Sequence, residues 1–567
     1  MKLFKNIKKW LENQEHLFYM FLFILIVPNI VLCFTEPLPL MAKVCNVLLP
    51  FACYYVLMTL SRNCGKMLWI LFLFVFFGAF QIVLLYLFGQ SIIAVDMFLN
   101  LATTNSSEAL ELLDNLIPAV IIVIVLYVPA LVLGMISIVK KRRLSIEFIH
   151  RERKRAFIVL GISLISLVGA YIQDSRYELK SDLYPVNVCY NVALAIQRNA
   201  LTQNYHETSK DFSFHARTTH PENEREVYVM VVGETSRTLN WQLYGYGRET
   251  NPNLSKQSGL IAFPKVLTES NTTHKSVPML LSNITACNYD SIYHQKGIIT
   301  TFKEAGFQTA FFSNQRYNRS FIDFFGMEAD TSDFIKEDSV SLTYNPSDDE
   351  LLKLVEQELA KGANKQFIVL HTYGSHFNYR ERYPSESAFF TPDYPADAEP
   401  KYRDNLINAY DNSIRYTDGF LARLIGLLEK QQVNAAMIYT SDHGEDIFDD
   451  SRHLFLHASP VPSYYQLHVP FLVWMSESYR TTYPEHWEGL TKNQNKNVSS
   501  SGSFFPTMLY LGGVETAYRD DSQSVASPLY TMKPRVYLND HNEPRPLDDL
   551  GMKKQDFQML KQKDINY

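Results

Sequence analysis

The sequence has few cysteines and no long run of basic residues. Only six cysteines occur in 567 residues, and four of them lie in the apolar N-terminal third. The other two, Cys189 and Cys287, allow at most one disulfide in an oxidising compartment, so a disulfide-stapled framework is excluded. The formal net charge of −6 is mild, and basic residues cluster in only one short loop, so we expect no nucleic-acid partner.

Long apolar runs dominate the first third of the chain. Each is close to the ~17–25 residues that a helix needs to cross a bilayer. Their clustering favours a five-helix transmembrane domain over residues 1–173 rather than buried helices of a soluble core. The first run is expected to be a retained anchor rather than a signal peptide, because it is long and more spans follow it. The five runs are 17–34, 44–60, 67–88, 117–139 and 156–172.

Lysine and arginine flank these runs unevenly. They occur before the first run, between the second and third, and above all between the fourth and fifth, at 140–155. The positive-inside rule therefore predicts a cytoplasmic N-terminus. Five spans would then place everything after about residue 173 outside the cytoplasm.

Residues 174–225 are expected to form a linker. The segment 183–200 mixes apolar and polar residues, which is typical either of a helix lying on the membrane surface or of an ordinary packed helix. The segment 201–225 is polar throughout.

From residue 226 to 567, apolar runs alternate with helical patterns. This alternation predicts an α/β domain with a mostly parallel sheet and helices on both faces. Two segments rich in Pro, Ser, Asn or acidic residues, 383–400 and 489–503, are expected to be exposed loops. The expected strands are 227–232, 307–312, 367–371, 436–440 and 471–474, and the expected helices are 347–359 and 402–429.

A carboxylate and an imidazole stand together where one expected strand ends. Asp442 and His443 follow the apolar run 435–439, and Glu234 follows the run 227–232. Ligands bind outside the carboxyl ends of strands in open α/β sheets. Asp, Glu and His suit zinc or a similar divalent cation, so we expect a metal site at this edge.

Two threonines precede a short apolar segment that could form a helix. Thr272 and Thr273 stand before residues 277–281. A hydroxyl there either caps the helix or serves as a nucleophile beside a phosphate. A metal can lower the pKa of a coordinated hydroxyl as it does for water. The residues alone do not distinguish the two threonines.

Taken in order, these motifs resemble the alkaline phosphatase and sulfatase superfamily, and most closely its membrane-bound phosphoethanolamine transferases. The resemblance runs through most of residues 226–530. It is carried by Gly233-Glu234-Thr235-Ser236-Arg237, Leu243-Tyr244-Gly245-Tyr246, Thr250-Asn251-Pro252, Thr273 with Ser276-Val277-Pro278, His371-Thr372-Tyr373-Gly374-Ser375-His376, Tyr410-Asp411-Asn412-Ser413, Ser441-Asp442-His443-Gly444-Glu445 and His468-Val469-Pro470.

The resemblance implies a catalytic zinc centre. Its ligands would be Glu234, Thr273, Asp442 and His443, and the spacing to Ser276-Val277-Pro278 selects Thr273 as the nucleophile. Manganese also suits this set, since hard oxygen ligands dominate. Magnesium fits less well because it seldom uses histidine.

Further residues receive substrate roles from the resemblance. His376 and His457 are expected to bind phosphate or a second metal, or to act as acid and base; idle loop histidines are the alternative. Between the third and fourth spans, Asn105 and Glu108 resemble a motif near the lipid headgroup, although Glu108 also fits a helix capping box. Weaker candidates for headgroup or site contacts are Asn314, Gln315 and His468, followed by His371 and His453.

The implied activity is transfer of phosphoethanolamine from phosphatidylethanolamine to lipid A or lipopolysaccharide core, through a covalent threonine intermediate. The implied location is the bacterial inner membrane with a periplasmic catalytic domain. Family members with several disulfides differ from this chain, which leaves the acceptor open. The alternatives are a glycerophosphotransferase or phosphodiesterase of the same superfamily and a non-enzymatic glycan-binding membrane protein. The Cys/Ser-x-Pro-x-Arg pattern of sulfatases is absent near residue 273.

Overall fold

The computed structural model describes residues 10–88, 92–103, 117–336 and 345–567. These residues form two compact units, one made of most of the first 196 residues and the other mainly of Gln197–Tyr567. Each unit has its own core.

The first unit is helical, and its helices begin and end close to the apolar runs of the sequence. Four helices are long and apolar enough to cross a membrane: α2 (Gln14–Thr35), α3 (Leu40–Met58), α8 (Ile117–Val139) and α9 (Ile146–Gln173). A fifth span exists only if α4 (Cys64–Ile70) and α5 (Phe72–Phe88) count as one, and they are bent by 64° at their junction. The predicted apolar helical part is confirmed, with four or five candidate spans.

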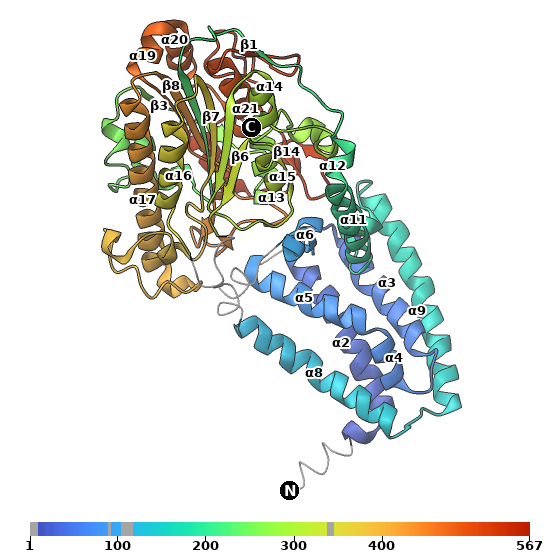
Figure 1. Ribbon diagram of the computed structural model, residues 1–567. Helices are drawn as coiled ribbons and strands as arrows, with labels where there is room; N and C mark the ends of the chain where they lie inside the picture. Colours follow the sequence, from blue (N-terminus) through green and yellow to red (C-terminus); the bar gives the residue numbers. More distant parts are fainter. Residues whose placement is uncertain (1–9, 89–91, 104–116, 337–344) are drawn as a thin grey trace. The chain divides into compact units, whose positions relative to one another are not determined.

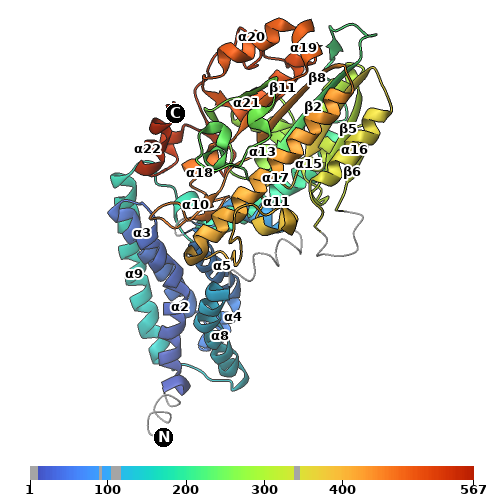
Figure 2. The same cartoon turned by 90° about the vertical axis from the view of Figure 1, so that its left-hand side faces the viewer.

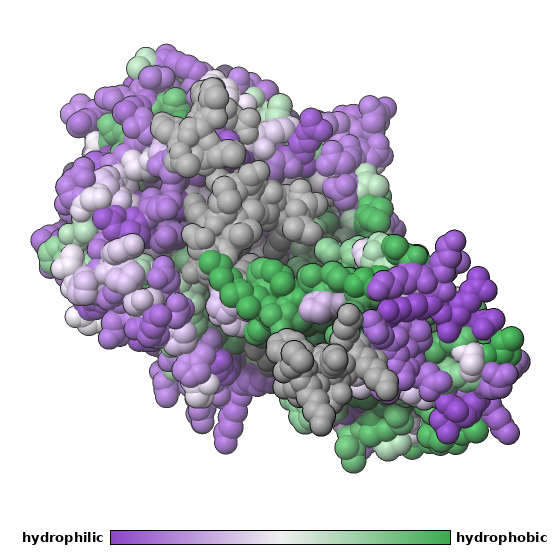
Figure 3. Space-filling view, turned by 90° about the horizontal axis from the view of Figure 1, so that it is seen from below, coloured by the Kyte–Doolittle hydropathy of each residue, from purple (hydrophilic) through white to green (hydrophobic). Residues whose placement is uncertain are grey.

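The outer surface of these helices is hydrophobic. Val125 on α8 is 68% exposed, and Ile165 and Ile172 on α9 are 72% and 80% exposed. Hydrophobic side chains gather over part of the surface in Figure 3. Water-facing helices rarely carry such side chains in contiguous patches, whereas lipid tails solvate them well.

The segment expected at 183–200 is a helix, α11 (Val186–Gln203). Val188 is fully buried and packs with Ile93 and Leu84 of the first unit. This packing supports the ordinary packed helix for the first turns of α11.

Reporter fusions test the predicted orientation. A reporter fused after residue 150 should lie in the cytoplasm, and one fused after residue 200 should lie in the periplasm. The reason is the basic loop at 140–155, which the positive-inside rule keeps in the cytoplasm. The reverse pattern in alkaline phosphatase and β-galactosidase fusions would contradict this orientation and exclude a reaction on the outer face.

The second unit is built on a seven-stranded sheet with the order β3-β11-β8-β2-β7-β5-β6. All pairs from β8 to β6 are parallel, and only β11 runs antiparallel to its neighbours. The mostly parallel sheet is therefore confirmed. Its strands are β2 (Glu226–Gly233), β3 (Leu260–Ala262), β5 (Gln308–Ser313), β6 (Thr331–Phe334), β7 (Lys365–His371), β8 (Asn434–Ser441) and β11 (Phe471–Met475).

Helices cover both faces of this sheet (Figures 1 and 2). On one side lie α16 (Asp349–Ala360) and α17 (Arg403–Lys430), and on the other lie α13 (Thr273–Leu280), α14 (Ile298–Glu304), α15 (Phe321–Gly326) and α21 (Ser500–Leu511). Every residue of β2 is buried, as expected for a parallel strand covered on both faces. Its alternate residues Tyr228, Met230 and Val232 join one hydrophobic core with residues of the second helix group.

The register of two neighbouring strands creates the site. Gly233 of β2 pairs with Ser441 of β8 in parallel. The next residues along each strand, Glu234 and Asp442, therefore leave the sheet side by side at its carboxyl edge.

Part of the expected linker belongs to the second unit. Residues 201–225 include α12 (Tyr205–Thr208) and β1 (Arg217–Thr218), which pairs with β13 (Val514–Glu515). Tyr205 and Phe214 are buried in the main core. Isolated aromatic residues in a polar segment fix it to the domain, and periodicity does not reveal them.

The prediction of an exposed loop at 489–503 is wrong. The segment contains the end of α20 (Pro484–Asn493), β12 (Val498–Ser499) and the start of α21. Its polar residues serve as caps and buried bonds: Ser499 accepts from the N–H of Gly502, and Asn493 donates to the carbonyls of Val525 and Ser527. The other expected loop, 383–400, is irregular and largely exposed.

Candidate metal centre and active site

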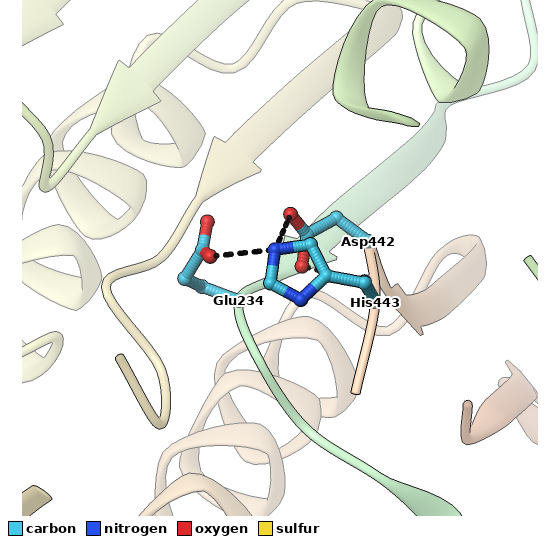
Figure 4. A group of neighbouring side chains, drawn as sticks. All are labelled: Glu234, Asp442 and His443. Carbon is cyan, nitrogen blue, oxygen red and sulfur yellow. Dashed lines mark hydrogen bonds and ion pairs between the residues drawn. The ribbon is translucent and has the colours of Figure 1, made fainter. Parts of the chain in front are cut away.

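Three ligand-type side chains converge at the carboxyl ends of β2 and β8. Glu234, Asp442 and His443 each offer one atom, and these atoms all lie within 4.8 Å of one another. His443 Nε2 is 3.2 Å from Asp442 Oδ2 and 3.5 Å from Glu234 Oε1 (Figure 4). All three side chains are buried. The adjacent strand ends bring together residues that are 208 positions apart.

The hydroxyl of Thr273 completes this group. Thr273 is the first residue of α13, and its Oγ1 lies 3.2 Å from Glu234 Oε1 and 3.1 Å from His443 Nε2. Thr272 is the N-cap, and its Oγ1 lies 3.1 Å from Ser270 Oγ. The structure thus separates the two threonines that the residue pattern leaves equivalent.

A backbone contact orients the imidazole. His443 Nδ1 lies 2.9 Å from the carbonyl oxygen of Gly444, so Nδ1 donates there and Nε2 keeps its lone pair. Only glycine fits at position 444, because a Cβ would lie 2.2 Å from the carbonyl oxygen of Tyr465. The loop can therefore pass close enough to hold the ring.

Burial disfavours the ionised carboxylates of Glu234 and Asp442 unless a cation balances their charge. Burial and the neighbouring Asp442 raise the pKa of Glu234 to about 8. Burial likewise raises the pKa of Asp442 to about 7, and it lowers the pKa of His443 to about 4, so this ring is neutral. Two buried carboxylates, a neutral imidazole and a hydroxyl match the donor set of a zinc site. The residues fit the metal that the sequence predicts.

One residue that the sequence reasoning missed joins both carboxylates. The Thr235 hydroxyl donates to Glu234 Oε1 at 2.8 Å, and the Thr235 N–H donates to Asp442 Oδ1 at 3.0 Å. Its φ of 60° is unusual for a β-branched residue and is sparsely populated because of steric strain. Tyr410 Oη donates to the Thr235 carbonyl at 2.7 Å and so holds this conformation. The sequence feature that could have identified Thr235 is its position directly after Glu234 in the motif.

Replacing Thr235 with valine should weaken metal binding. Valine keeps the shape but removes the hydrogen bond that fixes Glu234 Oε1, and such outer partners typically contribute 10–100-fold to affinity. We expect zinc affinity, measured by competition with a chromogenic chelator, to fall roughly 10–100-fold. Thr272→Val is the matched control, since its hydroxyl bonds to Ser270 and not to a carboxylate. Equal affinities in both variants and the wild type would contradict this role.

Two predicted histidines lie next to the metal group. The rings of His457 and His443 are 4.0 Å apart between centroids, and those of His376 and His457 are 6.4 Å apart. His457 Nδ1 lies 3.0 Å from Glu445 Oε1. Tyr379 Oη donates to Glu445 Oε2 at 2.5 Å. Glu445, a second missed residue, therefore orients His457, whose Nε2 makes no hydrogen bond to the residues that the structure describes.

Burial keeps both imidazoles neutral. It lowers the pKa of His457 to about 4 and, together with Arg382 and His457, lowers that of His376 well below its usual value. His376 Nδ1 lies 2.6 Å from the carbonyl oxygen of Phe377, and its ring stacks on Tyr373. Both rings can therefore accept a proton at Nε2 and, once protonated, donate a hydrogen bond to a phosphoryl oxygen.

Of the other residues predicted to contact substrate, one lies beside the metal-ligand group and the others lie elsewhere. Gln315 Nε2 donates to Glu234 Oε2 at 3.0 Å, so it holds a ligand. Asn314 is fully buried and donates to Asp348 Oδ1 and the carbonyl of Pro346. His468 has both ring nitrogens engaged, with Tyr464 Oη and the Pro264 carbonyl.

Internal hydrogen bonds use both ring nitrogens of His468 and the amide nitrogen of Asn314, whereas Asn314 Oδ1 is buried without a hydrogen-bond partner in the described part of the chain. Their substrate roles stay predictions. His371 is buried beside Ser313, and His453 is exposed. Asn105 and Glu108 lie outside the described residues. All six cysteines lie in the described part of the chain, and all are free.

The sulfatase family model matches residues 226–514. This range is more than half of the chain and contains every element that forms the metal group. The chain belongs to the sulfatase family.

"Phosphoethanolamine transferase EptA" of Escherichia coli K12 is 30% identical to this chain over 313 residues, which is 52% of this chain and 55% of that protein. The chain therefore spans about half the length of this relative. The C-terminal periplasmic domain of E. coli EptC, solved in complex with Zn, is 25% identical, with a TM-score of 0.55, and covers 60% of this chain and 97% of that domain.

A membrane protein of known structure shares the fold of nearly the whole chain. It is lipooligosaccharide phosphoethanolamine transferase A from Neisseria meningitidis, with a TM-score of 0.71 and 21% identity. The match covers 90% of this chain and 97% of that one. This match confirms the predicted fold, in which N-terminal apolar helices precede a sulfatase-type α/β domain.

Proposed function

We propose that this protein is a metal-dependent phosphoethanolamine transferase of the bacterial inner membrane. It moves phosphoethanolamine from phosphatidylethanolamine to lipid A or lipopolysaccharide core. The observation that carries the proposal is the position of the Thr273 hydroxyl, within 3.2 Å of both Glu234 and His443. Relatives that bear this name support it, as do the apolar helices that would keep the enzyme next to its lipid donor.

Glu234, Thr273, Asp442 and His443 would hold one zinc ion. When bound, zinc lowers the pKa of a coordinated hydroxyl and stabilises negative charge on phosphoryl oxygens. The zinc complex of the EptC domain supports this choice of metal. His376 and His457 lie close enough together to bind a second ion. The oxygen-rich ligand set would also suit manganese.

The residues of the site divide the reaction into two steps. Thr273 Oγ1 forms a bond to the phosphorus of phosphatidylethanolamine, and the bond from phosphorus to the diacylglycerol oxygen breaks. The hydroxyl proton passes to a base, and the departing diacylglycerol oxygen takes up a proton. A phosphate or hydroxyl group of the acceptor then attacks the phosphorus, and Thr273 is released.

His457 is placed to move these protons. Its Nδ1 is held by Glu445, so its Nε2 is the free, neutral base beside the metal group. His376 lies beside His457, with 6.4 Å between the ring centroids, and would share the acid–base role or, when protonated, donate to a phosphoryl oxygen. Both histidines would act on a substrate bound at the carboxyl edge of the sheet, where the strand ends converge.

Lipid analysis tests the proposed activity. Mass spectrometry should find phosphoethanolamine on lipid A or core from cells expressing the protein, and none on material from cells expressing Thr273→Ala. Diacylglycerol release without modified lipopolysaccharide would favour the phosphodiesterase alternative. Transfer of glycerophosphate would indicate the glycerophosphotransferase alternative. No turnover of phospholipid in the presence of bound glycan would favour a glycan-binding membrane protein.

A further inference from the structure

Exposed cations without an intramolecular counter-ion gather where α8 leads into α9. Lys140, Lys141 and Arg143 lie in the connecting loop, and Lys154 lies in the third turn of α9. All four are exposed, and within the described chain none of their side chains makes a hydrogen bond or an ion pair. One exposed acid, Glu147, lies in the same stretch. The loop therefore keeps a net positive charge.

Other cations at this end of the helices stabilise the fold. Arg62 Nε donates to the carbonyl of Leu144 at 2.9 Å, which joins two connecting loops. Arg142 and Arg153 also donate to backbone carbonyls. The charges of the four unpaired cations are not needed for these contacts.

A buried carboxylate holds two further arginines in a fixed arrangement. Glu152 is fully buried, and its Oε1 accepts from Arg151 Nε at 2.7 Å and from Arg155 Nη1 at 3.0 Å. Its Oε2 accepts from Tyr55 Oη at 2.5 Å. The arginine side chains remain 52% and 57% exposed. One carboxylate offsets one of the two positive charges, so N–H donors and one net charge remain available.

This cationic region borders a lipid-type surface. Directly after Arg155 on α9, Phe157 and Ile158 are each 56% exposed. At the end of α8, Val139 is 71% exposed. Exposed apolar side chains next to exposed cations are typical of the boundary between hydrocarbon and headgroups. Such a boundary would place the cations at the depth of lipid phosphates.

We propose that this surface binds the headgroups of anionic glycerophospholipids in the adjacent leaflet. It consists of Lys140, Lys141, Arg143, Arg151, Lys154 and Arg155, and we call it the α8–α9 cationic surface. Clusters of four to eight basic residues next to a membrane helix recognise anionic headgroups, and paired guanidinium groups match a phosphodiester. Phosphatidylethanolamine has no net charge and cannot neutralise the surface. The inference is independent of the proposed catalytic activity.

Nanodiscs of defined composition test this inference. The full chain is reconstituted in phosphatidylcholine alone, with added phosphatidylglycerol, or with added phosphatidylethanolamine. Thermal melting and native mass spectrometry of retained lipid are measured. Phosphatidylglycerol should raise the melting temperature and be retained, whereas retention of phosphatidylethanolamine, the proposed substrate of the catalytic site, should not depend on the cations of this surface. High salt should reduce the effect, because the charges are exposed.

The decisive variant replaces the four unpaired cations and leaves Glu152 and its partners intact. Each cation near an anionic surface strengthens binding about fivefold. The four substitutions Lys140→Gln, Lys141→Gln, Arg143→Gln and Lys154→Gln together should therefore reduce retention of phosphatidylglycerol by about two orders of magnitude or more. Lys141→Gln with Lys154→Gln should give a smaller loss in the same direction.

The matched control removes exposed cations beyond the other end of α9. Arg176→Gln with Lys180→Gln, whose side chains are 80% and 55% exposed, should retain phosphatidylglycerol like the wild type. The inference is overturned if the wild type retains phosphatidylcholine and phosphatidylglycerol equally, or if the quadruple variant retains phosphatidylglycerol fully. Equal losses in the quadruple and control variants would also overturn it, because they would indicate unspecific charge attraction.

Discussion

Thr273→Ala should reduce phosphoethanolamine transfer by at least about four orders of magnitude, the scale seen when an enzyme loses its nucleophile. The hydroxyl is the group that would bond to phosphorus, and it contacts both Glu234 and His443, whereas the Thr235 hydroxyl donates to Glu234 Oε1. The neighbouring Ser276 Oγ lies 2.9 Å from the Thr272 carbonyl and only 3.5 Å from Asp442 Oδ2. Initial rates with a fluorescent phosphatidylethanolamine measure the loss.

A trapping experiment links this loss to covalent chemistry. Wild-type protein incubated with phosphatidylethanolamine and no acceptor should accumulate a phosphoethanolamine group on the peptide that contains Thr273. Thr273→Ala should show no such adduct. Thr272→Ala is the control: its hydroxyl pairs with Ser270, so substantial activity and the adduct should remain.

Three outcomes would decide against this assignment. An adduct on Thr272 would move the nucleophile by one residue, against the distances observed. Full activity of Thr273→Ala would exclude a threonine intermediate. Diacylglycerol release by the wild type without any adduct would indicate direct attack by water and a phosphodiesterase.

The central sheet and the metal group could be predicted because strong local patterns encode both. The apolar runs 227–232 and 435–439 lie in strands that are buried on both faces, and such runs are visible without a structure. Polar residues directly after a parallel strand must appear at the carboxyl edge of the sheet. The sequence could not state that these two strands are neighbours, and the pairing of Gly233 with Ser441 now supplies that fact.

The residues that orient the ligands could not be predicted in the same way. Thr235 acts through a left-handed backbone conformation that a β-branched residue seldom adopts, so propensity argues against it. The internal bonds of Asn314 and His468 could not be predicted either. Both ring nitrogens of His468 and the amide nitrogen of Asn314 bond inside the domain, whereas Asn314 Oδ1 has no partner within the described residues, so the substrate roles of both stay predictions. Burial of a polar side chain depends on contacts that are distant in sequence.

Removing the metal should make the stability of the protein depend strongly on pH. In the metal-free protein, burial raises the pKa of Glu234 to about 8 and that of Asp442 to about 7, above the ordinary values of 4.5 and 3.8. The folded state then holds protons that the unfolded state has released, so the free energy of unfolding falls as pH rises from about 4 to about 8. Thermal melting of chelator-treated protein at pH 5, 6.5 and 8 measures this fall.

Zinc should reverse the trend, because it replaces those protons. Its stabilisation should grow with pH over the same interval and reach about 4 kcal/mol at a thousandfold excess over Kd. The double variant Asp442→Ala with His443→Ala should lose the tightly bound ion and gain no stability from zinc. His453→Ala is the matched control, since this exposed histidine lies near the same loop and does not belong to the metal group.

The control variant should bind about one zinc per chain, the number expected of a single four-ligand site, and should melt like the wild type. If the wild type binds two zinc ions per chain and the double variant still binds one, the remaining ion would be assigned to a second site at His376 and His457. If the double variant keeps all its zinc, the ligand assignment is wrong. If the metal-free wild type melts at the same temperature from pH 5 to 8, the two carboxylates are not buried together without a cation. Such a result would contradict the strand register that places Glu234 beside Asp442 in the site.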